Sequence, residues 1–125
     1  MFGLFKNMAK YNGNVNLKLN NEYQISTEDN PRFPGVLVYL QLIDNAWAAR
    51  MSEDEAAMYI ATLYFCGLAK AGYEDEAVEL QGRIISVANF CVPKGIISQE
   101  KFSDFAAAIR EAADKADLTK TCNLT

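Results

Sequence analysis

Apolar residues recur at a helical spacing through most of the chain. From about residue 34 onward the period is close to 3.6 residues, which predicts four helices separated by Gly, Pro and capping residues. The first is expected from about residue 34 to 50. Ser52, with Glu55 three positions later, forms an S-x-x-E capping box that starts the second. Because no Gly or Pro separates Arg50 from Glu53, one unbroken helix from about residue 35 to 71 stays open as an alternative.

The expected second helix is apolar on all sides. Between residues 56 and 69 only Thr62 is plainly polar, which predicts a central position in the bundle or contact with a second copy. Gly72 ends this helix as a C′ glycine, and a third helix follows until Pro93. The fourth starts near Ser98. Short connections make successive helices antiparallel neighbours.

The first thirty residues have a different pattern. Seven asparagines precede Pro31, and their helix propensity is poor. Apolar and polar residues alternate on both sides of Asn20 and Asn21, at Val15, Leu17 and Leu19 and then at Tyr23 and Ile25, and this alternation predicts a short hairpin. The predicted fold is therefore mainly α, a four-helix antiparallel bundle with an N-terminal β-hairpin arm. The arm would occupy residues 1–33 and the helical domain residues 34–125, in one folding unit overall.

Composition and charge exclude several catalytic mechanisms and argue against one class of ligand. The 125 residues are 50% hydrophobic and 22% charged, which suits one globular domain, and none is histidine. Nucleophiles activated by histidine and H-E-x-x-H zinc sites are therefore excluded. The net charge of −4 argues against a nucleic-acid binder. Between Asp44 and Glu79 eight acidic residues stand against only Arg50 and Lys70, a field that would steer a basic partner.

The carboxylates and cysteines form no convergent cluster in this predicted bundle. The triplets 53–55 and 74–76 begin antiparallel helices and would lie some 25 Å apart, so neither a metal nor a cofactor is expected. Cys66, Cys91 and Cys122 include no C-x-x-C pair and predict a reducing, cytoplasmic compartment. The first two would stand roughly 18 Å apart along the helix axis, beyond the reach of a disulfide.

These features favour a non-enzymatic, acidic helical protein for protein–protein interaction, of chaperone, toxin-neutralising or adaptor type. A basic protein is the expected partner, and a homodimer is one arrangement left open. The predicted partner-binding residues are two acidic edges and two tyrosines near the turns: Glu53, Asp54, Glu55, Tyr64, Tyr73, Glu74, Asp75, Glu76 and Glu79.

Two competing interpretations remain. The first is a small-molecule-binding protein or enzyme with a pocket inside the helical bundle, where Tyr39, Asp44 and Tyr59 would supply polar groups. A deeply buried Asp44 without a cap or a cationic partner would favour it. The second is weak membrane association through the apolar residues 2–5. Stable insertion is not expected, because no apolar run is long enough to span a bilayer.

Overall fold

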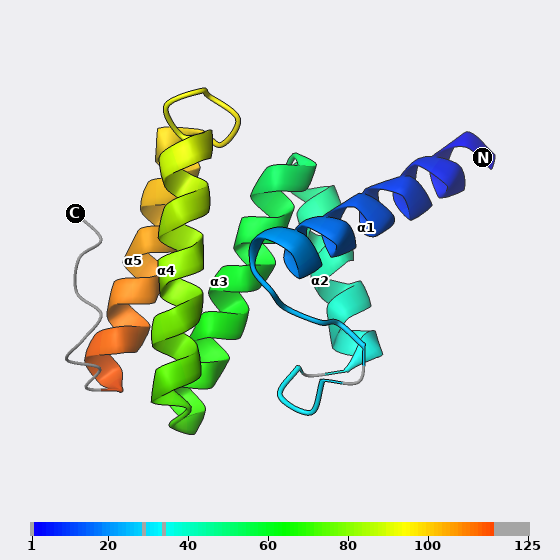
Figure 1. The fold of residues 1–125 in the computed structure, drawn as a ribbon. Coiled ribbons are helices and arrows are strands. Elements are labelled where there is room, and N and C mark those ends of the chain that lie inside the picture. Colours follow the sequence, from blue (N-terminus) through cyan, green and yellow to red (C-terminus); the bar gives the residue numbers. More distant parts are fainter. Residues whose placement is uncertain (1, 29, 34, 117–125) are drawn as a thin grey trace. The chain divides into compact units, whose positions relative to one another are not determined.

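Five helices make up the described part of the chain (Figure 1). The computed structural model describes residues 2–28, 30–33 and 35–116. Its helices are α1 (Phe2–Glu22), α2 (Val36–Ala48), α3 (Glu53–Ala71), α4 (Glu74–Cys91) and α5 (Gln99–Lys115). The predicted mainly α class is confirmed. The four-helix bundle with a β-hairpin arm is wrong, because the described residues form five helices and no strand.

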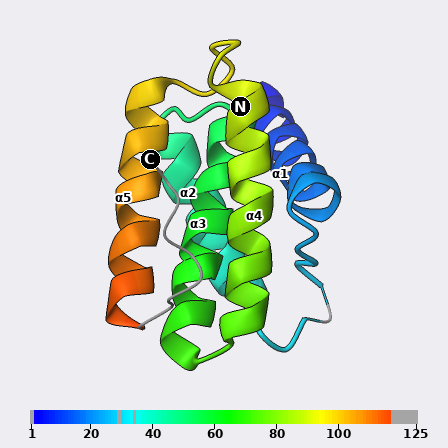
Figure 2. The same cartoon turned by 60° about the vertical axis from the view of Figure 1, so that its left-hand side comes forward.

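Two compact units divide the chain, residues 1–57 and 58–125, and the division falls inside α3. Unit 1 holds α1, α2 and the first turn of α3. Unit 2 holds the rest of α3 with α4 and α5. Within unit 2 these helices run side by side, each antiparallel to the one before it (Figure 2). The short connections between them account for that order.

The segment predicted as a hairpin is the C-terminal part of α1, up to Glu22, and the irregular residues that follow it. Its buried side chains recur at every fourth position, at Tyr11, Val15 and Leu19, and the buried Tyr23 directly follows the helix; none of the four is more than 7% exposed. Leu17, which the alternating pattern placed on the same face as its apolar neighbours, is 56% exposed. The helix therefore buries three large side chains in one stripe, and this burial outweighs the poor helix propensity of the asparagines.

The predicted break between α2 and α3 is confirmed, and the unbroken helix is wrong. The N–H of Met51 donates to the carbonyl of Ala46 and the N–H of Arg50 donates to that of Trp47, both at 3.0 Å. These two bonds form a Schellman motif, which ends α2 with Arg50 in the left-handed region at φ 58°.

The other predicted helix signals are confirmed. Gly72, at φ 87°, ends α3 in the same motif, because the N–H of Tyr73 donates to the carbonyl of Leu68 at 2.9 Å. Ser98 caps α5 by accepting a hydrogen bond from the N–H of Lys101 at 3.1 Å.

Two further observations concern cysteine and the membrane. Cys66 and Cys91 are thiols outside any disulfide, whereas Cys122 lies outside the described residues. None of the helices, as far as they are described, has both the length and the apolar character needed to cross a membrane. The side chains of residues 2–5, which the weak membrane interpretation invoked, lie outside the described part of the structure.

Candidate functional site

The tetrapeptide Glu-Asp-Glu-Ala occurs twice, at the start of α3 and at the start of α4. Its carboxylates form the α3 triplet (Glu53, Asp54 and Glu55) and the α4 triplet (Glu74, Asp75 and Glu76). Both were predicted to bind a partner. Acidic residues in the first turn of a helix interact favourably with its dipole, so this effect is common to the two triplets.

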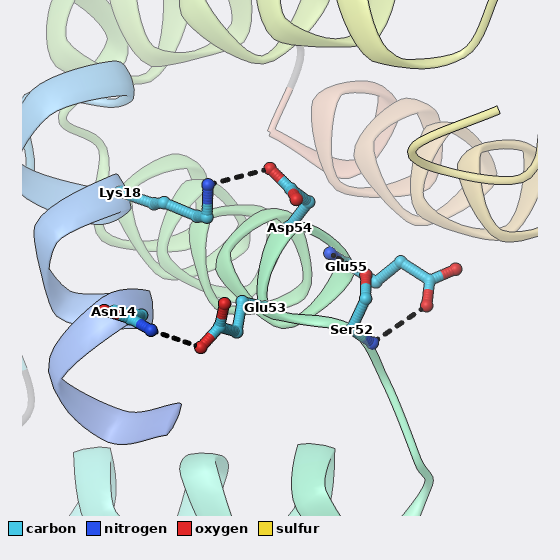
Figure 3. A network of polar contacts seen from close by, with 6 residues as sticks. All are labelled: Asn14, Lys18, Ser52, Glu53, Asp54 and Glu55. Atoms are coloured by element: carbon cyan, nitrogen blue, oxygen red, sulfur yellow. Dashed lines mark hydrogen bonds and ion pairs between the residues drawn. The ribbon is translucent and has the colours of Figure 1, made fainter. Parts of the chain in front are cut away.

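Contacts within unit 1 engage every carboxylate of the α3 triplet (Figure 3). Asn14 Nδ2 donates a hydrogen bond to Glu53 Oε2 at 2.6 Å, and Lys18 Nζ lies 3.0 Å from Asp54 Oδ1. Glu55 Oε1 accepts from the Ser52 N–H at 3.0 Å, while the Glu55 N–H donates to Ser52 Oγ at 3.1 Å. The predicted capping box is confirmed.

The contact between Lys18 and Asp54 is partly shielded from water, with about a quarter of each side chain exposed. Burial lowers the pKa of Lys18, but the hydrogen bond to Asp54 and the charges of Asp54, Glu22 and Glu53 outweigh it and raise that pKa above its ordinary value. The α3 triplet therefore fastens α1 to the first turn of α3.

Sequence reasoning missed Asn14 and Lys18. Because they stand four residues apart, they share one face of α1, whereas the hairpin interpretation gave this segment a period of two. The available signal was the spacing of Tyr11, Val15 and Leu19, which also recur at every fourth position.

An open groove of about 760 Å³ lies beside the α3 triplet in unit 1. The rings of Tyr11 and Trp47 meet edge to face there, with centroids 5.0 Å apart, and Tyr11 Oη donates to the carbonyl of Met51 at 3.0 Å. Burial, followed by the charges of Glu53 and Glu55, raises the pKa of Tyr11 to about 12. Lys10 and Arg50 also line this groove, and sequence reasoning assigned neither of them a role.

The α4 triplet has a different environment. All three of its residues are exposed, and Tyr73, which precedes them, is 42% exposed. No side chain caps the start of α4 at Tyr73. We call Tyr73 together with the α4 triplet the acidic corner. It belongs wholly to unit 2.

The other predicted partner-binding residues lie close in sequence to the acidic corner but differ in exposure. Glu79 accepts a hydrogen bond from Arg83 Nη2 at 2.6 Å, an i,i+4 ion pair on α4. Tyr64 is half-buried on α3. Of the predicted set, Tyr73, the α4 triplet and Glu79 are therefore exposed, and Glu79 already pairs with Arg83.

The residues predicted for an internal pocket differ in how deeply they are buried. Asp44 is exposed on α2. Tyr39 is buried in unit 1, where its ring lies 5.8 Å from that of Phe33 and burial raises its pKa to about 12. Tyr59 is half-buried in unit 2. The buried Asp44 that would have favoured this interpretation is not observed.

A second groove, in unit 2, contains Cys66. Its Sγ lies 3.9 Å from the carbonyl oxygen of Ala108, and burial, followed by the charge of Glu111, raises the pKa of the thiol. A raised pKa keeps a thiol protonated and weakens it as a nucleophile. Among the described residues, no group of three or more Cys, Asp or Glu side chains could hold a metal ion.

Comparison of the chain with protein-family models, with curated protein sequences and with solved structures gave no match.

Proposed function

We propose that the protein is a non-enzymatic, protein-binding helical protein that receives a basic surface of its partner at the acidic corner. The observation that carries the proposal is the exposure of Tyr73 beside three exposed carboxylates. A tyrosine next to charged groups combines apolar contact area with electrostatic steering of an oppositely charged partner.

The contrast with the α3 triplet supports the proposal. The same tetrapeptide at the start of α3 is held by Asn14, Lys18 and Ser52, so its charges already serve contacts inside unit 1. The α4 triplet keeps its surface toward solvent. An exposed field of this kind accelerates encounter with a basic partner, and salt screens it.

The surface of the described residues also supports a binding role. Several large apolar side chains are exposed, among them Leu37 at 83% and Phe90 at 61%. Leu37, Val38 and Leu40 lie within one turn of α2, and exposed apolar side chains that gather in this way commonly mark sites of protein–protein contact. The thiols of Cys66 and Cys91 support the reducing, cytoplasmic setting included in this proposal.

Affinity purification from the native cell followed by mass spectrometry tests the proposal. The bait is the intact chain, compared with a variant whose α4 triplet is neutralised, E74Q/D75N/E76Q. The matched control, E100Q/D104N/D114N, removes the same charge from exposed positions on α5. We expect one protein with a basic surface to be retained by the wild type and the control and lost from the α4 variant.

The association rate of that protein is then measured at rising salt. A rate that falls steeply agrees with recognition through exposed charges. A rate independent of salt, or equal retention by the wild type and the α4 variant, would overturn the proposal.

A further inference from the structure

The groove in unit 1 is locally basic, although the whole chain has a net charge of −4. Lys10 and Arg50 line it, and within the described residues neither forms an ion pair or a side-chain hydrogen bond. The one carboxylate in its lining, Glu53, already accepts a hydrogen bond from Asn14. Two cations without partners therefore stand beside the aromatic surface of Tyr11 and Trp47.

The backbone at Arg50 adds to this picture. In the described residues a left-handed residue follows the ends of α1, α2 and α3: α3 uses Gly72 there, whereas α1 uses Gln24 at φ 58°. At the end of α2 the same position is Arg50, at φ 58°. A side chain in this conformation is strained relative to glycine. The hydrogen bonds that end α2 place Arg50 in the lining of the groove.

A ligand suited to this groove has carboxylates next to an aromatic side chain. The carboxylates would meet Lys10 and Arg50, and an aromatic side chain would pack against the half-buried Trp47. The acidic corner of this same chain offers that combination at its surface, with Tyr73 directly before three exposed carboxylates.

We infer that the basic partner surface is the groove of a second copy of this chain, so that one copy's acidic corner docks beside Lys10 and Arg50 of the next. This inference rests on the proposed function and names the partner of the acidic corner. The contact joins two different surfaces, so each bound copy leaves one groove and one corner unused. Association therefore proceeds to larger oligomers, unless the first few copies close into a ring.

Sedimentation velocity at low salt over a range of concentrations tests the inference. The wild type should form concentration-dependent oligomers. The groove variant K10E/R50E and the corner variant E74K/E76K should each weaken association about tenfold or more, because each places like charges against each other. Circular dichroism and thermal unfolding confirm that each variant is folded.

Mixing the two variants gives the sharpest outcome. The corner of K10E/R50E and the groove of E74K/E76K are both intact, and the reversed groove and the reversed corner are again opposite in charge, so the mixture should recover the association that each variant lacks alone. The matched controls, K70E/R110E and E100K/D104K, change net charge equally at positions outside the groove and the corner. They should associate like the wild type.

A second variant separates binding from folding. Arg50→Gly removes a cation and relieves a left-handed residue, so it should raise the melting temperature and weaken association severalfold. A merely structural Arg50 would leave association unchanged.

A wild type that stays monomeric at low salt, or folded variants that do not associate when mixed, would overturn the inference. In that event, retention of another basic protein by the wild type and not by E74Q/D75N/E76Q would still support the proposed function. If neither self-association nor retention of another basic protein is observed, the inference and the proposed function are both overturned.

Discussion

The starts of α3 and α4 have the same four residues and opposite surroundings. At α3 the carboxylates meet Asn14, Lys18 and the cap residue Ser52. At α4 the carboxylates are exposed and follow an exposed tyrosine. Composition and helix position are matched, so the partners supplied by α1 account for the difference. An acidic helix start therefore makes contacts within unit 1 in one place and is exposed in the other, where we propose a binding surface.

The largest expected effect is on stability. E53Q/D54N/E55Q should lower the free energy of unfolding by about 2 kcal/mol more than E74Q/D75N/E76Q, because the first variant loses the partly buried ion pair of Asp54 with Lys18 and the charge on the acceptor of Asn14, whereas the residues of the α4 triplet are exposed. The helix-dipole contribution is common to both and cancels in the comparison. Urea unfolding of the two variants measures the difference. Equal losses would show that the α1 contacts contribute nothing.

The next largest difference expected between the two triplets is in their response to salt. Raising the salt concentration should slow association at the acidic corner by about tenfold, because exposed charges beyond a Debye length are screened. The contacts of the α3 triplet are short and partly buried, so the free energy of unfolding should change by less than about 1 kcal/mol over the same range. Stopped-flow association and urea unfolding, run in the same buffers, make the comparison. Parallel salt dependence in both would contradict it.

The cap residues give a smaller effect. Ser52→Ala should cost about 1 kcal/mol, because the N–H of Glu55 loses its acceptor. Tyr73→Ala should cost less than about 0.5 kcal/mol, since Tyr73 is exposed and supplies no side-chain cap. Thermal unfolding of both variants tests this, and a larger loss at Tyr73 than at Ser52 would refute it.

The smallest effect concerns the titration of Tyr11. Its pKa is raised to about 12, so the folded state keeps a proton that the unfolded state releases above about pH 10. Stability from this group is complete below pH 10 and falls as the pH rises toward 12.

Neutralising the two charges near Tyr11 tests their share of the shift. E53Q/E55Q should lower the pKa of Tyr11 and still leave it above its ordinary value, because burial is the largest cause. E74Q/E76Q should leave it unchanged. Ultraviolet absorbance titration reads both. If E53Q/E55Q and E74Q/E76Q changed the pKa of Tyr11 equally, the charges of Glu53 and Glu55 would not be a specific cause of its raised value.

The parts of the fold that local signals determine were predictable from sequence. Ser52 with Glu55, the glycine at Gly72 and the cap at Ser98 each act within a few residues, and they located the ends of the last three helices. The break after α2 was also predicted, although its left-handed residue is Arg50, which gives no turn signal of its own.

The first helix was not predictable by the same means. Asparagine propensity and the alternation at Val15, Leu17 and Leu19 indicated a strand, whereas burial of every fourth residue determined a helix. That error also hid the contacts of Asn14 and Lys18, because both depend on α1 lying against the start of α3. Charge alone could not distinguish the two triplets. The side chains that contact the α3 triplet, Asn14 and Lys18, lie about forty positions earlier in the chain.

The measurement that tests the central claim most directly is a paired one on E74Q/D75N/E76Q: urea unfolding and sedimentation velocity on the same sample. We predict that the free energy of unfolding stays within about 1 kcal/mol of the wild-type value while association is lost. Association that persists, or a loss of stability as large as that of E53Q/D54N/E55Q, would contradict the division between a structural α3 triplet and a binding α4 triplet.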